Sequence, residues 1–155
     1  MEIAVAQDAH VPGIVEVWKE FMDFHKDIDP HWTRAEDGQI HFENRVQESI
    51  VSEDALVLVV LAENRVVGYS LSEKRKNPPV LAEQEYGYIS DMAVTANSHR
   101  QGIGEQMLAR ILQWFESHSV DRIELSVASA NEIGYSFWQK HGFREFLREL
   151  YLQRK

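Results

Sequence analysis

The chain contains no cysteine among its 155 residues. Disulfide frameworks, thiolate metal sites and cysteine nucleophiles are therefore excluded. Long apolar runs are also missing, because the longest, Leu56 to Ala62, falls far short of the roughly 20 residues that a membrane span requires. The first residues, Met1-Glu2-Ile3, lack the basic and apolar regions of a secretory signal. We therefore expect a cytoplasmic protein that does not enter a membrane.

Basic residues are few, with 16 Lys and Arg against 25 Asp and Glu, for a net charge of −9. This balance disfavours a nucleic-acid-binding surface. It suits a cationic substrate such as an amine, although acidic surfaces also serve solubility alone. The apolar fraction of 44% predicts a globular fold, and the length predicts a single domain over residues 1–155.

Apolar periodicity and turn residues predict elements in the order β-α-α-β-β-β-α-β-α-β. The expected strands are 3–6, 55–62, 66–73, 85–94, 122–127 and 143–152. The first expected helix follows an N-cap at Asp8 and has Pro12 near its start; the others cover 38–50, the stretch from the glycine turn to about 117, and 131–141. The fold class is therefore α/β, with a mixed sheet. The two strand-helix-strand passages near the end predict parallel pairing there.

A glycine turn links the predicted strand 85–94 to the next helix. Its residues are Gln101-Gly102-Ile103-Gly104. Closely spaced glycines let backbone approach a ligand, and the first turn of a helix offers unpaired N–H groups to phosphate. The same residues are also consistent with a tight turn that binds nothing.

Three passages resemble the GNAT N-acetyltransferase superfamily. Residues 88–94, Tyr-Ile-Ser-Asp-Met-Ala-Val, are similar to its central strand, and residues 101–104 are similar to its acyl-CoA pyrophosphate loop. Asn131, followed by Lys140-x-Gly142-Phe143, is similar to its late helix and the strand after it. The three passages occur in the family's order and spacing, and they cover nearly the whole chain.

The resemblance implies a sheet splayed between the fourth and fifth strands, helices on both faces, acetyl-CoA as cosubstrate and no metal. It implies that the backbone of Met92, Ala93 and Val94 pairs with the pantetheine arm, with the Met92 N–H as donor to the oxyanion. The expected pyrophosphate contacts are His99, Arg100, Gln101, Gly102, Ile103 and Gly104. Asn131 is expected to bind pantetheine, or to cap its helix. Trp138 is placed among the CoA contacts, where the family often has a tyrosine.

Two residues are candidates for the proton transfers. Thioester aminolysis needs a neutral amine, so a carboxylate near the acceptor is expected to act as base. Asp91, next to the expected oxyanion donor, is the first candidate; it is alternatively a structural partner of a cation. Tyr135 lies one turn before Trp138 and is the candidate acid, or else a packed aromatic residue.

The resemblance implies that the first two helices and the loop between them cover the acceptor. The segment from Phe24 to Trp32 offers His25, Asp27, Asp29 and Trp32, which suit a cationic amine through charge and cation–π attraction. Alternatively, the segment is a solvated loop without a ligand role. A metal site is not expected, because nothing in the sequence fixes a coordination geometry.

The expected function is therefore acetyl transfer from acetyl-CoA to a primary amine, directly within a ternary complex. A non-catalytic acyl-CoA-binding module is the alternative, and a structural domain that binds no CoA is the third hypothesis. The expected partners are acetyl-CoA and an amine-bearing substrate. A homodimer is also expected, with the apolar strand 143–152 as an edge that another copy can use.

Overall fold

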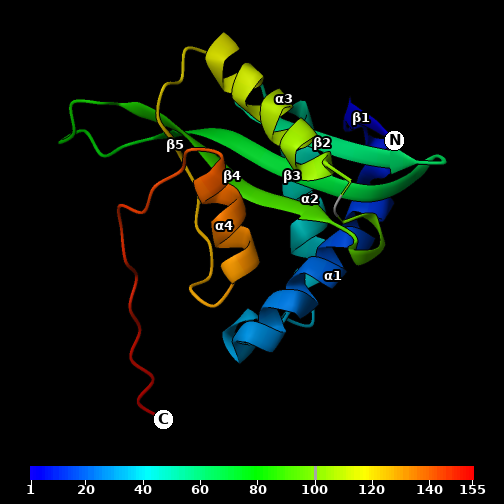
Figure 1. Ribbon diagram of the computed structural model, residues 1–155, viewed down its shortest axis with the longest axis horizontal. Coiled ribbons are helices and arrows are strands. Elements are labelled where there is room, and N and C mark those ends of the chain that lie inside the picture. The colour runs from blue at the N-terminus through cyan, green and yellow to red at the C-terminus, as the bar shows by residue number, and fades with distance from the viewer. Residues whose placement is uncertain (100) are drawn as a thin grey trace.

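The computed structural model describes residues 1–99 and 101–155 and shows a five-stranded sheet with helices on both faces (Figure 1). The strands are β1 (Glu2–Val5), β2 (Ala55–Ala62), β3 (Arg65–Lys76), β4 (Glu85–Val94) and β5 (Ile123–Glu124). The helices are α1 (Val11–Ile28), α2 (Gly38–Val51), α3 (Ile103–Ser117) and α4 (Glu132–Lys140), with short 3-10 turns at Asp8–His10, Pro30–Trp32 and Ala96–Ser98.

The strands lie in the order β1-β2-β3-β4-β5. The first four pair antiparallel, and β4 pairs parallel with β5. Glu63 and Asn64 join β2 to β3 with φ angles of 52° and 64°, the left-handed geometry that matches a tight hairpin to the strand twist. This mixed sheet confirms the predicted fold class.

Each face of the sheet has its own hydrophobic core. On one face, Ile14 of α1 and Val46 of α2 pack with Val57 and Tyr69. On the other face, Ile111 and Phe115 of α3 pack with Leu58 and Ile89, and α4 adds Phe137 and Trp138 at the margin. Figure 1 shows α3 in front of the sheet and α2 behind it. Gly87 is needed for this contact, since a Cβ there would lie 2.6 Å from the Phe115 ring.

Two sequence predictions are wrong at the C-terminal end. The strand expected over 122–127 covers only Ile123–Glu124. The strand expected over 143–152 does not form, because the chain adopts no regular secondary structure after the turn that ends α4. The pattern of residues 143–152 suits a strand, but a strand is stable only when another backbone satisfies its N–H and C=O groups. The described chain provides no such partner, so the element order ends with α4.

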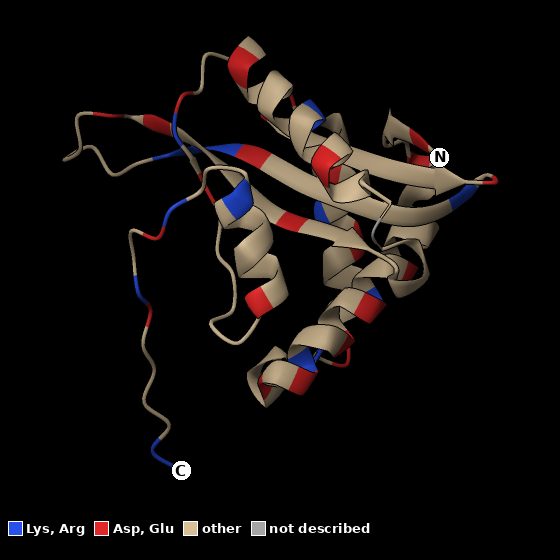
Figure 2. Ribbon diagram, in the orientation of Figure 1, with Lys and Arg blue, Asp and Glu red and all other residues tan. Residues whose placement is uncertain are grey.

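Acidic and basic residues both occur on α1, α3 and α4 (Figure 2). Among the described residues, no helix is both long enough and apolar enough to cross a membrane.

Candidate active site

A bulge in β4 marks the centre of the candidate site. The β3–β4 register places Leu71 opposite Asp91 and Ser72 opposite Ile89, so Ser90 is the extra residue. Beyond the bulge, β4 also loses its neighbour on the other side, because its pairing with β5 is limited to Gly87 and Tyr88. Within the described chain, the second half of β4 therefore has one paired edge and one open edge.

The amide of Met92 faces this open edge. The N–H of Thr95 donates to the carbonyl of Val67 on β3 over 2.8 Å. Backbone groups of successive residues alternate between the two edges of a strand. Met92, three residues earlier, therefore directs its N–H and C=O away from β3. A donor in this position is free to bind a ligand oxygen.

The glycine turn and the start of α3 lie directly after β4. Gly102 has a φ of 73°, and α3 begins at Ile103 without a side-chain cap. A Cβ on Gly102 would meet only Gln106 Nε2 at 3.9 Å, so the space over the turn is open. At position 104, glycine is favoured for a different reason: a Cβ there would lie 3.2 Å from the Phe137 ring of α4. The expected contact at Arg100 lies outside the described residues.

The His99 ring already makes a hydrogen bond within the protein. Its Nε2–H donates to the carbonyl of Val94 over 2.8 Å, which fastens the glycine turn to the end of β4. Gln101, by contrast, is exposed at the turn. The sequence could not reveal the His99 contact, because it depends on how the chain reverses after β4.

Helix α4 forms the other side of the open edge. Asn131 caps it, with Oδ1 accepting from the N–H of Gly134 over 3.0 Å, and the half-buried Tyr135 and Trp138 follow on its body. Trp138 packs edge-on against Phe143, with ring centroids 5.2 Å apart. The N-cap role expected for Asn131 is confirmed, while its contact with pantetheine remains a prediction.

An ion pair links the end of α4 to the start of α3. Lys140 Nζ lies 2.7 Å from Glu105 Oε1. The hydrogen bond and charge of Lys140 lower the pKa of Glu105, so this carboxylate is ionised at neutral pH. The two helices are thereby tied together beside the glycine turn.

Asp91 lies on the opposite face of the sheet from α3. The residue is only 9% exposed, and its Oδ2 accepts a 2.7 Å hydrogen bond from the hydroxyl of Tyr69. Arg45 of α2 places Nη1 3.9 Å from Asp91 Oδ1 and donates from Nη2 to Ser90 Oγ over 2.7 Å. Burial raises the pKa of Asp91, while Tyr69, Arg45, Ser90 and His25 oppose that rise.

Tyr69 and Arg45 are the site residues that sequence reasoning missed. Burial and the neighbouring Asp91 raise the pKa of Tyr69 well above its ordinary value, so Tyr69 keeps its proton and remains a donor. Its partner across the sheet is Ala93, which makes it a diagonal neighbour of Asp91. The register of the β3–β4 pair is the signal that could have identified Tyr69 as a neighbour of Asp91. Arg45 approaches only through the packing of α2.

The four residues predicted to bind the acceptor make separate contacts within the protein. The rings of His25 and Trp32 lie 6.0 Å apart, and the Nδ1–H of His25 donates to the carbonyl of Phe21 over 2.9 Å. Asp29 instead accepts from the backbone N–H of His31 over 2.9 Å, and Asp27 is exposed. Across the described parts of the chain, no three His, Asp or Glu side chains gather closely enough to hold a metal ion.

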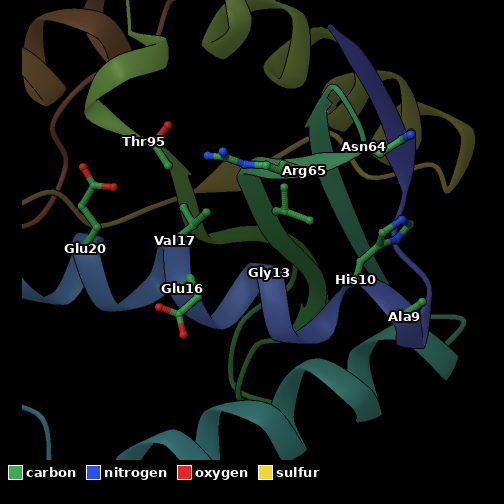
Figure 3. Close-up of a pocket in the computed structure, with 10 residues that line it drawn as sticks. Ala9, His10, Gly13, Glu16, Val17, Glu20, Asn64, Arg65 and Thr95 are labelled. Carbon is green, nitrogen blue, oxygen red and sulfur yellow. The ribbon is translucent and has the colours of Figure 1, made fainter.

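A hollow of about 510 Å³ lies at the start of α1, and none of the predicted site residues lines it (Figure 3). Its walls come from α1, the β2–β3 turn and the end of β4; its lining residues include Gly13, Val17, Arg65 and Thr95. On the α1 side of the hollow, Glu20 accepts from the N–H of Ala96 over 3.0 Å. The hollow thus adjoins a contact that positions the segment leading into the glycine turn.

A strand with an open edge, followed by a glycine turn and a helix N-terminus, is the arrangement expected from the resemblance to the acetyltransferase superfamily. The sequence profile of the acetyltransferase (GNAT) family matches residues 14–143. The chain therefore belongs to the GNAT acetyltransferase family, and acyl transfer is the class of reaction that this membership supports. No curated protein matches the chain.

Solved structures share this fold over nearly the whole chain. A variant of the BH1408 protein from Bacillus halodurans is 24% identical, with a TM-score of 0.88 and 99% of each chain covered. A predicted acetyltransferase from Clostridium acetobutylicum, solved with acetyl-CoA, is 18% identical, with a TM-score of 0.79 and coverage of 98% and 95%. The aminoglycoside 6′-N-acetyltransferase AAC(6′)-Ig from Acinetobacter haemolyticus is 15% identical, with a TM-score of 0.77 and coverage of 100% and 99%.

Proposed function

We propose that this protein transfers an acetyl group from acetyl-CoA to a primary amine, directly within a ternary complex. The observation that carries the proposal is the open edge of β4. There the free amide of Met92 directly follows the buried Asp91 in β4, which leads through the glycine turn into α3. The acetyl-CoA seen with the Clostridium protein and the aminoglycoside acceptors named for the Acinetobacter enzyme support the choice of both substrates.

The residues present fit the binding of acetyl-CoA. The space over Gly102 is open, and α3 begins without a side-chain cap. The first N–H groups of α3 and the helix dipole can therefore stabilise a pyrophosphate there. The pantetheine amides find strand-like partners on the open edge of β4, at the N–H and C=O of Met92 and the N–H of Val94. No metal is needed for either contact.

The chemical step uses the two residues that follow the bulge, Asp91 and Met92. The nitrogen of the neutral amine attacks the thioester carbonyl, and the Met92 N–H donates to the oxygen as negative charge develops on it. The C–S bond then breaks, and CoA leaves as the thiolate. The proton lost by the amine passes to Asp91, directly or through water. Burial raises the pKa of Asp91, which brings it closer to that of an effective base.

The thiolate leaves without a dedicated acid in this scheme. Trp138 stands at the position where the family often has a tyrosine, and its indole N–H does not serve as an acid. Free thiols have pKa values near ~8.5, so CoA thiolate is a tolerable leaving group. Tyr135, half-buried on the same helix, is the residue available should protonation be needed.

The acceptor is proposed to approach from the side of α1 and α2. His25 and Trp32 lie near each other there, and both offer ring surfaces to an amine. Asp27 is exposed on the same helix as His25 and adds negative charge. Asp29 contributes less, since its carboxylate already caps the turn after α1.

The deciding experiment is calorimetric titration with acetyl-CoA, followed by a free-thiol assay over polyamines, aminoglycosides and peptides with free amino groups. Micromolar binding with amine-dependent release of CoA is expected. Binding without release by any amine would instead favour the alternative, a non-catalytic acyl-CoA-binding module. This alternative is motivated by Trp138, which stands where the family often has a tyrosine. The absence of any acetyl-CoA binding would overturn both.

A further inference from the structure

The hollow at the start of α1 has the size of a small-molecule site. Its volume of about 510 Å³ falls within the roughly 300–1,000 Å³ that ligand sites in proteins occupy. Gly13, Val17 and Val66 give it an apolar lining. Helix α1 and strand β3 are in direct contact there, because a Cβ on Gly13 would lie 2.7 Å from the Cβ of Val66. The apolar part of the hollow is therefore fixed by the packing of the fold.

Charged groups of both signs line the same hollow. Glu16 and Glu20 stand one helical turn apart on α1, and Arg65 begins β3 on the other side. Figure 3 shows Glu20 on the α1 side and the Arg65 guanidinium reaching across toward Thr95. The carboxylate of Glu16 already has a partner, because its Oε1 lies 3.2 Å from Lys19 Nζ. Glu20 is therefore the carboxylate that is available to a ligand.

The Arg65 side chain is also available. It is exposed, and the ion pairs within residues 1–99 and 101–155 include no carboxylate partner for it. A guanidinium group binds a carboxylate through two parallel hydrogen bonds. The hollow therefore offers one site for a carboxylate, one for an ammonium group, and apolar surface between them.

Glu20 joins the hollow to the segment that leads into the glycine turn. Its Oε1 accepts from the N–H of Ala96 over 3.0 Å, and the second oxygen of a carboxylate can accept from another donor. Ala96 begins the 3-10 turn that ends at Ser98, and Gly102 follows four residues after that turn. A ligand that holds the Glu20 carboxylate in place therefore also holds the start of this segment.

We infer that the hollow is an effector site for an amino acid with an apolar side chain, and that its binding orders the segment before the glycine turn. The ammonium group of the ligand binds Glu20, its carboxylate binds Arg65, and its side chain lies against Val17 and Val66. A ligand with one charge leaves one of the two protein groups without a partner, so both charges are required.

The effect on acetyl-CoA rests on the proposed function. If the glycine turn binds the pyrophosphate, a ligand that has already ordered the preceding segment lowers the entropic cost of binding acetyl-CoA. Coupling of this kind is reciprocal, so acetyl-CoA should strengthen amino-acid binding by the same factor. The effector site itself does not depend on the reaction.

The first test is an NMR titration of the protein alone with L-leucine, L-leucinamide and 4-methylpentanoate. We expect leucine to bind with a Kd of about 1 mM or lower and to shift the amide signals of residues around the hollow. Leucinamide lacks the carboxylate and 4-methylpentanoate lacks the ammonium group. Each should bind about tenfold more weakly, because each loses one hydrogen-bonded charge.

Variants locate the site. Arg65→Gln and Glu20→Gln should each weaken leucine binding by about tenfold. Glu20→Gln retains an oxygen that can accept from Ala96, so its effect reports the charge. Lys76→Gln is the matched control for Arg65→Gln: Lys76 is exposed at the other end of β3 and should leave leucine affinity unaltered.

The link to the glycine turn has two readouts. Hydrogen exchange of the Ala96 amide should slow when leucine is added, since its hydrogen bond to Glu20 opens less often. This measurement needs no acetyl-CoA. In calorimetry, saturating leucine should lower the Kd of acetyl-CoA by about fivefold or more.

Three results would overturn the inference: no leucine binding, leucine binding that both Arg65→Gln and Glu20→Gln leave unaltered, or leucine binding that leaves Ala96 exchange unchanged. The second result would place leucine elsewhere, for example at the acceptor site through its own amine. A protein that binds leucine at the hollow but never binds acetyl-CoA would refute the proposed reaction and not the effector site. An active enzyme that does not bind leucine would refute only the effector site.

Discussion

Replacing Tyr69 by phenylalanine should shift the pH dependence of the reaction toward higher pH. The hydroxyl of Tyr69 donates to Asp91 Oδ2 over 2.7 Å, and the whole side chain is buried. Phenylalanine keeps the ring, which packs 5.9 Å from the Phe42 ring centroid, and removes only the donor. The change therefore acts on the ionised form of Asp91 and not on the shape of the core.

The size of the shift follows from the strength of that hydrogen bond. A hydrogen bond to a charged group contributes about 1.5–3 kcal/mol, and about 1.4 kcal/mol corresponds to a factor of ten. Deprotonation of Asp91 should become about 10- to 100-fold less favourable, so its pKa rises above the wild-type value. If Asp91 is the base, activity on the acid side falls by that factor, while the rate on the alkaline plateau is nearly retained.

The assay is kcat/KM for CoA release as a function of pH, with thermal unfolding recorded in parallel. Tyr86→Phe is the matched control, since it removes a phenol hydroxyl from the far half of β4. We expect the Tyr86→Phe profile to coincide with that of the wild type. A Tyr69→Phe profile that also coincides, in a protein that is still folded, would show that Asp91 is not the group that titrates in the reaction.

The remaining predictions concern Asp91, the glycine turn and Tyr135. Asp91→Asn should lower the rate by about 10²- to 10⁴-fold and leave acetyl-CoA affinity unchanged; equal turnover would remove Asp91 as base. Burial raises the pKa of Asp91, so the protonated form of Asp91 stabilises the fold. This stabilisation is complete below the unfolded-state pKa of about 4 and is lost as pH rises through the folded-state pKa. The melting temperature of Asp91→Asn should therefore rise relative to that of the wild type as pH increases. Gly102→Glu should abolish acetyl-CoA binding in calorimetry, whereas Gly102→Asn, which tolerates positive φ, should retain most of it; equal affinities would refute the phosphate-loop assignment. Tyr135→Phe should keep the wild-type rate in the thiol assay, and a loss of about tenfold or more would identify it as the acid.

Local patterns were enough to predict most of the elements. The sequence placed β4 at Glu85–Val94 and β2 at Ala55–Ala62, as the structure has them, because alternating or continuous apolar runs bounded by turn residues depend on little beyond their own neighbours. The glycine turn was also visible, since a left-handed residue before a helix calls for glycine. The family followed from the order and spacing of these same passages.

Tertiary structure decided the properties that depend on segments far apart in the chain. Tyr69, Arg45 and Asp91 come from β3, α2 and β4, and only the sheet register and the packing of α2 bring them together. His99 was expected at phosphate, but its ring donates to the end of β4. The sequence alone determined that residues 143–152 suit a β-strand. The fold decided that residues 1–99 and 101–155 offer this segment no partner strand, and strand hydrogen bonds require a second backbone.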